Sequence, residues 1–281
     1  MDEAMRQVVR PFLRWAGGKQ KLVKFLLPFV PVSSSYETYY EPFFGGGALF
    51  FAVRPENAVL SDINSALMNC YRQVARNADR VLQVLREYSR RDSPDFFYET
   101  RAMSTRGMSV VEQAARFIYL NKAAFNGIYR VNRLGQFNVP YGPSFKGPAI
   151  PSREKLALAG ASLMKAKILD GDFEEALSDA KAGDFVYLDP PYPPRSETAY
   201  FTHYSAERFG WDQQLRVARL FSELSDRGCF VMLSNADQKK IVDLYRNVRV
   251  SRLHTLRWLG SNGDRFCVRE IVVTNYAPSE V

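Results

Sequence analysis

The residues best suited to chemistry form the tetrapeptide 189–192 (Asp-Pro-Pro-Tyr), which directly follows the apolar run 185–188 (Phe-Val-Tyr-Leu). A short apolar run between turn residues is typical of a buried strand in a parallel sheet. Ligands of such sheets bind beyond the carboxyl ends of the strands, where the tetrapeptide lies. The pattern therefore predicts a ligand-binding or catalytic site. The alternative interpretation is a polar residue that ends the strand, followed by a rigid Pro-Pro turn.

The tetrapeptide can activate the exocyclic amine of a nucleobase. The amine nitrogen is a poor nucleophile because its lone pair is delocalised into the ring, and attack on an electrophilic methyl group requires it to become pyramidal. The carboxylate of Asp189 and the backbone carbonyl of Pro190 can each accept one N–H, which stabilises the nitrogen as it gains positive charge. The ring of Tyr192 offers a face on which the base can stack. This chemistry needs no metal and no covalent intermediate, and a base in a duplex must flip out to reach it.

The glycine-rich segment 41–47 (Glu-Pro-Phe-Phe-Gly-Gly-Gly) predicts a cofactor loop. It follows a predicted strand at 36–41 and opens a predicted helix at 48–54, and its glycines let a ligand approach the backbone closely. No Gly-Lys-Ser/Thr sequence follows, which argues against a triphosphate. Asp62 comes at the end of the next predicted strand, 58–60, and is spaced like a carboxylate that accepts ribose hydroxyls. Both features indicate an adenosine-containing cofactor, and dinucleotides fit the spacing equally well.

The segment 170–173 (Asp-Gly-Asp-Phe) adds a third element to this site. It follows a predicted strand at 166–169 and precedes a predicted helix at 174–181. Asp172 can accept an adenine amine, and Phe173 can pack on the adenine ring. An ordinary turn before a helix is the alternative.

The elements that position these segments alternate between strands and helices, which predicts a doubly wound α/β sheet. The C-terminal runs 248–258 and 266–276 can pair as a β-hairpin. A helix within 205–227 shows apolar residues at helical spacing. Its predicted buried face consists of Leu215, Ala218, Phe221 and Leu224.

The middle of the chain differs from its ends. Residues 63–120 are mostly helical in pattern, and 113–153 contain no Asp or Glu but six Lys or Arg. With a formal net charge of +8, this basic tract favours a polyanionic partner, although a solvated basic face would also explain it. We expect a catalytic domain of residues 1–62 and 166–281, interrupted by a helical insertion at 63–165.

Residues 12–19 (Phe-Leu-Arg-Trp-Ala-Gly-Gly-Lys) resemble the opening motif of the Dam-type, or D12-class, adenine-N6-specific DNA methyltransferases. The order of the later segments also matches, so the resemblance spans nearly the whole chain. It implies a doubly wound sheet of the S-adenosylmethionine-dependent methyltransferases, with a C-terminal β-hairpin and a helical DNA-recognition insertion. It also implies methyl transfer to N6 of adenine in double-stranded DNA.

The resemblance carries particular roles to this sequence. The catalytic residues are Asp189, Pro190 and Tyr192. The residues that contact S-adenosylmethionine are Trp15, Lys19, Glu41, Phe43, Gly45, Asp62, Asp172, Phe173 and Asp189. Lys19 suits the carboxylate of the methionine end, and Trp15 suits the sulfonium or the methionine chain through a cation–π contact.

By the same resemblance, DNA is read by residues of the basic tract together with one residue of the opening motif. These are Arg14, Phe125, Asn126, Arg130, Asn132 and Pro140. Phe125 and Asn126 would fill the gap left by the flipped base, with the ring of Tyr129 available to stack beside them, while Arg130 and Pro140 would lie near a guanine. The implied target is GATC. Phe125 departs from the family, because relatives that read GATC often carry Tyr there, whose hydroxyl is lost.

Other functions fit less of the sequence. A cytosine-N4 methyltransferase uses the same chemistry but more often has Ser in place of Asp189, and a cytosine-C5 enzyme needs a Pro-Cys pair that this sequence lacks. A non-catalytic DNA-binding module would leave the segments 12–19 and 189–192 unexplained. A dehydrogenase would need the glycine spacing GxGxxG.

The remaining composition bears on cofactors and location. Three scattered cysteines and two histidines argue against a disulfide framework and a metal site. No signal peptide and no apolar run long enough for a membrane are evident, so we expect a cytoplasmic enzyme that needs no metal. A companion restriction endonuclease for the same site is possible, and the sequence does not indicate the oligomeric state.

Overall fold

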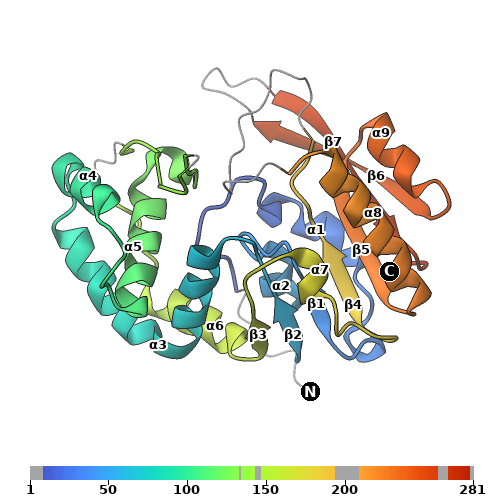
Figure 1. Cartoon of the computed structure of the whole chain (residues 1–281), viewed down its shortest axis with the longest axis horizontal. Coiled ribbons are helices and arrows are strands. Elements are labelled where there is room, and N and C mark those ends of the chain that lie inside the picture. Colours follow the sequence, from blue (N-terminus) through green and yellow to red (C-terminus); the bar gives the residue numbers. More distant parts are fainter. Residues whose placement is uncertain (1–8, 133, 143–146, 194–208, 259–264, 279–281) are drawn as a thin grey trace.

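The computed structural model describes residues 9–132, 134–142, 147–193, 209–258 and 265–278. Its centre is a seven-stranded sheet in the order β3-β2-β1-β4-β5-β7-β6 (Figure 1). The strands are β1 (Tyr39–Glu41), β2 (Ala58–Leu60), β3 (Ala166–Ile168), β4 (Phe185–Leu188), β5 (Phe230–Ala236), β6 (Arg249–Trp258) and β7 (Arg265–Thr274). Strands β1 to β5 pair in parallel, and β7 pairs antiparallel with both β5 and β6. The predicted α/β sheet and C-terminal hairpin are confirmed.

The sheet is covered on both faces, as a doubly wound fold requires. Consecutive residues of β4 face opposite sides, because Phe185 and Tyr187 belong to one hydrophobic cluster while Val186 and Leu188 belong to another. The strand order reverses direction between β1 and β4. In open α/β sheets, ligands bind at such a reversal, beyond the carboxyl ends of the strands. The loops that follow β1 and β4 therefore border the expected binding crevice.

Helices connect the strands and build the side of the molecule beyond β3 (Figure 1). Those next to the sheet are α1 (Val23–Leu26), α2 (Ala48–Val53), α7 (Phe173–Ala176), α8 (Trp211–Asp226) and α9 (Lys239–Val242). Those between β2 and β3 are α3 (Ser65–Arg90), α4 (Pro94–Ala102), α5 (Val110–Ala123) and α6 (Arg153–Leu163), with the 3-10 turn η4 (Phe125–Gly127) after α5. Side-chain caps start each of these four helices between β2 and β3. Asn64, Ser93 and Ser152 each accept a backbone N–H, and Ser109 forms a capping box with Glu112.

The buried face of helix α8 overlaps the predicted one, with Ala218 partly buried, but includes Gln214 in place of Leu215. Leu215 is 40% exposed, whereas Gln214 is only 1% exposed and occupies the buried side. Phe221 and Leu224 are buried as predicted. Gln214 can occupy this side because its amide is paired, donating to the carbonyl of Pro191 and accepting from the buried side chain of Asn235. The N-terminal end of the predicted helix, residues 205–208, lies outside the described residues.

The predicted helix 174–181 is also shorter than expected. Asp172 caps α7 by accepting the N–H of Glu174, but the helix ends at Ala176. From Leu177 to Ala180 the backbone bonds run to the third preceding residue, as in 3-10 turns. The tight turns carry the chain into β4 without a full helix.

Candidate active site

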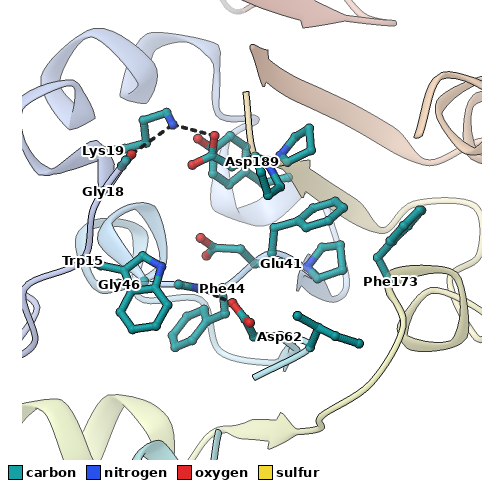
Figure 2. A pocket seen from close by; sticks show the side chains of 18 of the residues that line it. Trp15, Gly18, Lys19, Glu41, Phe44, Gly46, Asp62, Phe173 and Asp189 are labelled. Carbon is teal, nitrogen blue, oxygen red and sulfur yellow. Dashed lines mark hydrogen bonds and ion pairs between the residues drawn. The ribbon is translucent and has the colours of Figure 1, made fainter. Parts of the chain in front are cut away.

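A cavity of about 290 Å³ lies at the carboxyl ends of β1 and β4 (Figure 2). It is close in size to the smaller sites that hold drug-sized ligands, roughly 300–1,000 Å³. All of the residues predicted to be catalytic or to bind a cofactor line it. These are Trp15, Lys19, Glu41, Phe43, Gly45, Asp62, Asp172, Phe173, Asp189, Pro190 and Tyr192. The fold therefore brings together residues that are up to 177 positions apart in the sequence, from Trp15 to Tyr192.

Asp189 is held through one carboxylate oxygen. Its Oδ1 lies 2.6 Å from Nζ of Lys19 and accepts a 2.8 Å hydrogen bond from the hydroxyl of Ser234, which itself lies 2.9 Å from the hydroxyl of Tyr187. Figure 2 shows the Lys19 side chain pointing at this carboxylate. Within the described part of the chain, no hydrogen bond reaches Oδ2. The arrangement fixes the carboxylate and leaves one oxygen to accept a further donor.

Two contacts fix the side chain of Tyr192, one at its ring face and one at its hydroxyl. The ammonium of Lys19 lies 4.4 Å from the centre of its ring, a cation–π distance, and its hydroxyl donates a 2.7 Å hydrogen bond to Oε2 of Glu270 on β7. Burial, with the charges of Asp189 and Glu270, raises the pKa of the Tyr192 phenol well above its usual range. The phenol therefore stays protonated and acts as a donor to Glu270.

Glu41 lies at the end of β1 and is 3% exposed. Its Oε2 accepts a 2.6 Å hydrogen bond from the hydroxyl of Tyr39. Burial raises the pKa of Glu41 to about 8, and the charge of Asp189 acts in the same direction, while the bond from Tyr39 and the charge of Lys19 oppose it. Near neutral pH this side chain is therefore mainly a neutral acid.

The glycine-rich loop contacts both Trp15 and Asp62. Asp62 accepts the N–H of Gly45 at 2.9 Å and that of Asn64 at 3.0 Å. Gly45 has φ +45°, and a Cβ at this position would lie 2.8 Å from the indole of Trp15, so glycine is required there. Burial raises the pKa of Asp62, and the two backbone bonds oppose that rise.

At the far end of the cavity, Asp172 and Phe173 are held by Arg216 of α8. The guanidinium donates to both carboxylate oxygens of Asp172, at 2.9 and 3.1 Å, and lies 4.6 Å from the ring centre of Phe173. Phe173 also contacts the ring of Phe43 at 5.1 Å. Together with Phe209 these rings give this end of the cavity an aromatic wall.

Comparison with known proteins decides the family. The family model for D12 class N6 adenine-specific DNA methyltransferases matches residues 15–259. The chain belongs to this family.

Relatives agree with this assignment over nearly their whole length. A type II methyltransferase of Lactococcus lactis subsp. cremoris is 41% identical over 275 residues, which cover 95% of this chain and 96% of that protein. A type II methyltransferase of Methanocaldococcus jannaschii is 35% identical, covering 95% and 99%. A DNA adenine methylase of Escherichia coli is 32% identical, covering 97% of both chains. The protein is thus an adenine-specific DNA methyltransferase of the D12 class, and its substrate is DNA.

The predicted DNA-contacting residues of this D12-class enzyme lie outside the cavity lining. Phe125 is 48% exposed, and Asn126 and Pro140 are also exposed. Asn132 is half-buried, and Arg130, also half-buried, donates a 2.8 Å hydrogen bond to Asn138.

Arg14 reaches the same region through its backbone. The side chain of Asn121 on α5 accepts from its N–H at 2.9 Å and donates to its carbonyl at 2.7 Å. The Arg14 side chain is exposed and packs against Gly127, whose φ of +63° favours glycine. The opening motif is therefore attached directly to the helical part of the chain.

The expectation that Tyr129 offers its ring to DNA is wrong. Tyr129 is only 8% exposed and is packed 5.1 Å from Trp15 and 4.9 Å from Phe117. The indole of Trp15 needs a large apolar surface beside the glycine loop, and the ring of Tyr129 provides it.

Several residues that shape the site were missed by sequence reasoning. Ser234, Glu270 and Arg216 contact predicted site residues, but each is a common polar residue within a strand or helix and carries no motif. Asn235, next to Ser234 near the end of β5, offered a weak signal, since ligands of such sheets bind beyond the strand ends. No helix within the described ranges is long and apolar enough to cross a membrane, and no cluster of metal-binding side chains occurs there.

Proposed function

We propose that this enzyme transfers the methyl group of S-adenosylmethionine to N6 of an adenine that is flipped out of duplex DNA, within GATC. The observation that carries the proposal is the geometry of Asp189, whose Oδ1 is held by Lys19 and Ser234 while Oδ2 remains for an amine N–H. The alternative with cytosine N4 as target uses the same chemistry. The family supports adenine.

In the proposed mechanism, Asp189 and the carbonyl of Pro190 accept the two N–H groups of adenine N6. Both acceptors favour the pyramidal nitrogen over the planar amine, so they lower the barrier rather than tighten ground-state binding. The face of Tyr192 stacks on the base. Glu270 and Lys19 hold this ring in one orientation, which limits the positions that the target nitrogen can take.

The cavity suits S-adenosylmethionine in its distribution of charge. When bound, this cofactor supplies an electrophilic methyl group on a sulfonium. Asp62 has lone pairs beyond those used by Gly45 and Asn64, so it can accept ribose hydroxyls. The aromatic wall of Phe43 and Phe173 suits the adenine ring, and Asp172 suits its amine. Trp15, Lys19, Glu41 and Gly45 line the part of the cavity between the glycine loop and Asp189.

Lys19 can serve two carboxylates. Its ammonium has three donors, and its contacts within the described chain are Asp189, the carbonyl of Gly17 and the Tyr192 ring. A cofactor carboxylate can take a further position beside it. Lys19 then links the methionine end of the cofactor to the carboxylate that binds the target amine.

We assign target recognition to the helical insertion at 63–165 and catalysis to 1–62 and 166–281. Within the insertion, the exposed ring of Phe125 can stack in the gap left by the flipped base, with Asn126 beside it. Arg130 uses only Nε for Asn138, so its terminal nitrogens can pair with guanine. Asn132, Pro140 and Arg14 complete the proposed DNA contacts. Because two relatives are named type II methyltransferases, we also propose a companion restriction endonuclease for the same site.

The test is methylation of unmodified plasmid DNA with labelled cofactor, followed by mapping of the modified bases. We expect N6-methyladenine within GATC. N4-methylcytosine would contradict the adenine target, and N6-methyladenine in another sequence would contradict GATC alone.

The mechanism is tested by Asp189→Ala. Losing an acceptor that acts in the transition state should slow transfer by roughly a hundredfold or more, while binding of duplex DNA and of S-adenosylhomocysteine is kept. Asp179→Ala, which removes an exposed carboxylate outside the cavity, is the matched control and should behave like the wild type. Undiminished transfer by Asp189→Ala would refute the mechanism.

A further inference from the structure

The catalytic loop has few backbone donors of its own. In residues 189–193 (Asp-Pro-Pro-Tyr-Pro), three of the five residues are prolines and lack an N–H. Such a segment cannot hold its shape through ordinary turn hydrogen bonds. Its carbonyl groups still need donors where they are shielded from water, so those donors must come from elsewhere in the molecule.

Two glutamine side chains supply them. Gln214 of α8 donates a 2.8 Å hydrogen bond to the carbonyl of Pro191, and Gln238, after β5, donates a 3.2 Å bond to the carbonyl of Pro193. Gln214 is in turn held by Asn235 at the end of β5, which donates to its Oε1 at 3.0 Å. A chain of amides therefore runs from the central sheet through α8 to the backbone of the catalytic loop.

The burial of these amides is unfavourable unless they are hydrogen-bonded. Gln214 is 1% exposed and Asn235 is fully buried, while Leu215 next to Gln214 is 40% exposed. An apolar residue at position 214 would match the surrounding hydrophobic cluster, and burying an amide is costly without well-made hydrogen bonds. One of the two bonds of Gln214 reaches the loop itself, at the carbonyl of Pro191, and the other connects Gln214 to Asn235 on β5.

We infer that Gln214 is a positioning residue for methyl transfer. It fixes the Pro191 peptide between the two groups that the proposed function uses, the carbonyl of Pro190 and the ring of Tyr192. Asp189 is held separately by Lys19 and Ser234, and the Tyr192 hydroxyl by Glu270. Gln214 thus holds the backbone between Asp189 and Tyr192 through the carbonyl of Pro191. This inference rests on the proposed function.

The test is Gln214→Met, which keeps the length of the side chain and removes the donor. A small displacement of reacting groups lowers the rate much more than it lowers binding, so single-turnover methyl transfer should fall roughly ten- to a hundredfold. The KM values for DNA and cofactor, and the Kd of S-adenosylhomocysteine, should stay within about twofold of the wild type. A purely structural role would not separate kcat from KM in this way.

Phe221→Leu is the matched control. Phe221 lies on the same helix and is 2% exposed, but its ring packs 5.4 Å from that of Tyr245 and does not line the cavity. Measured well below its melting temperature, this variant should transfer methyl groups at the wild-type rate despite lower stability. A transfer rate of Gln214→Met equal to that of the wild type, or reduced only as far as that of Phe221→Leu, would overturn the inference.

A second variant covers the case in which Gln214→Met does not fold. Gln238 is half-buried, so Gln238→Ala removes the Pro193 bond with less risk to the fold, and should slow transfer about two- to tenfold with unchanged KM. Unchanged transfer by this variant would contradict the inference that glutamine amides position the catalytic loop. Failure of the wild type to form N6-methyladenine would refute the proposed function instead, so the two failures are distinguishable.

Discussion

Two carboxylates of the cavity differ in the partners that surround them. Asp189 receives a cation and a hydroxyl, from Lys19 and Ser234, whereas Glu41 receives the hydroxyl of Tyr39 within the sheet. Burial raises the pKa of Glu41 to about 8, and the nearby charge of Asp189 adds to this effect. A neutral Glu41 beside an ionised Asp189 avoids placing two negative charges together in a small cavity.

The stability of the protein should therefore depend on pH through Glu41. Its pKa when folded lies above that of an unfolded chain, so the folded state loses stability as pH rises from about 4.5 to about 8. In Glu41→Gln this loss is absent. Its stability relative to the wild type should increase across that window, by on the order of a few kcal/mol at about 1.4 kcal/mol per pKa unit.

Urea unfolding of both proteins at a series of pH values measures this effect. Glu223→Gln on the exposed side of α8 is the control, and its stability should run parallel to the wild type. Parallel curves for Glu41→Gln as well would show that Glu41 is ionised in the folded protein.

At the scale of elements, the sequence predicted the strands and their loops better than the helices. Strands β2 and β4 begin and end as expected, because short apolar runs between turn residues are a local signal. At the start of α8, Leu215 was predicted to be buried instead of Gln214, because hydrophobic periodicity cannot reveal a buried polar residue. Tyr129 was misplaced for a related reason. An aromatic residue in a basic tract can either stack on DNA or pack in the hydrophobic core. For Tyr129 the choice depends on Trp15, a residue distant in the sequence whose ring lies beside it.

The site could be predicted as far as motifs reach. The residues 12–19, 41–47 and 189–192 each carry a recognisable pattern, and the structure places all three at one cavity. No local pattern predicts Arg216, Glu270 or Gln214, because these residues act through contacts between distant segments of the chain. Motifs identified the groups that line the cavity, and the structure was needed to find those that hold them.

The turn η4 and the segment after it support a prediction about sequence choice. Arg130→Ala should reduce discrimination at one guanine of the target by ~1–3 kcal/mol, with little change for DNA altered elsewhere. The measurement is kcat/KM for duplexes that differ from GATC by single base pairs. Asn138→Ala removes only the tether of the guanidinium, so it should give a smaller loss at the same base pair. Uniform weakening for every duplex would make Arg130 a phosphate contact instead.

At the scale of the whole molecule, the helical part and the sheet share one hydrophobic core. A single cluster contains Phe97 and Tyr119 of the helices together with Phe185 and Tyr187 of the sheet. The opening motif runs between the two parts and is bound to Asn121 through both backbone groups of Arg14. Target recognition and catalysis are therefore proposed for two regions that are physically one packed unit.

This shared core predicts that the protein unfolds in one cooperative step. Asn121→Ala removes both hydrogen bonds to Arg14 and should lower stability by ~1–3 kcal/mol, which corresponds to a fall of a few degrees in Tm. Calorimetry should still show a single transition, shifted as a whole. Asn69→Ala removes two hydrogen bonds within the helical part, to the carbonyl of Val110 and from Gln73, and should shift the same transition less because the bond to Val110 is exposed to water. If Asn121→Ala instead split the transition in two, the regions would be separately stable domains, and residues 63–165 could fold without the sheet.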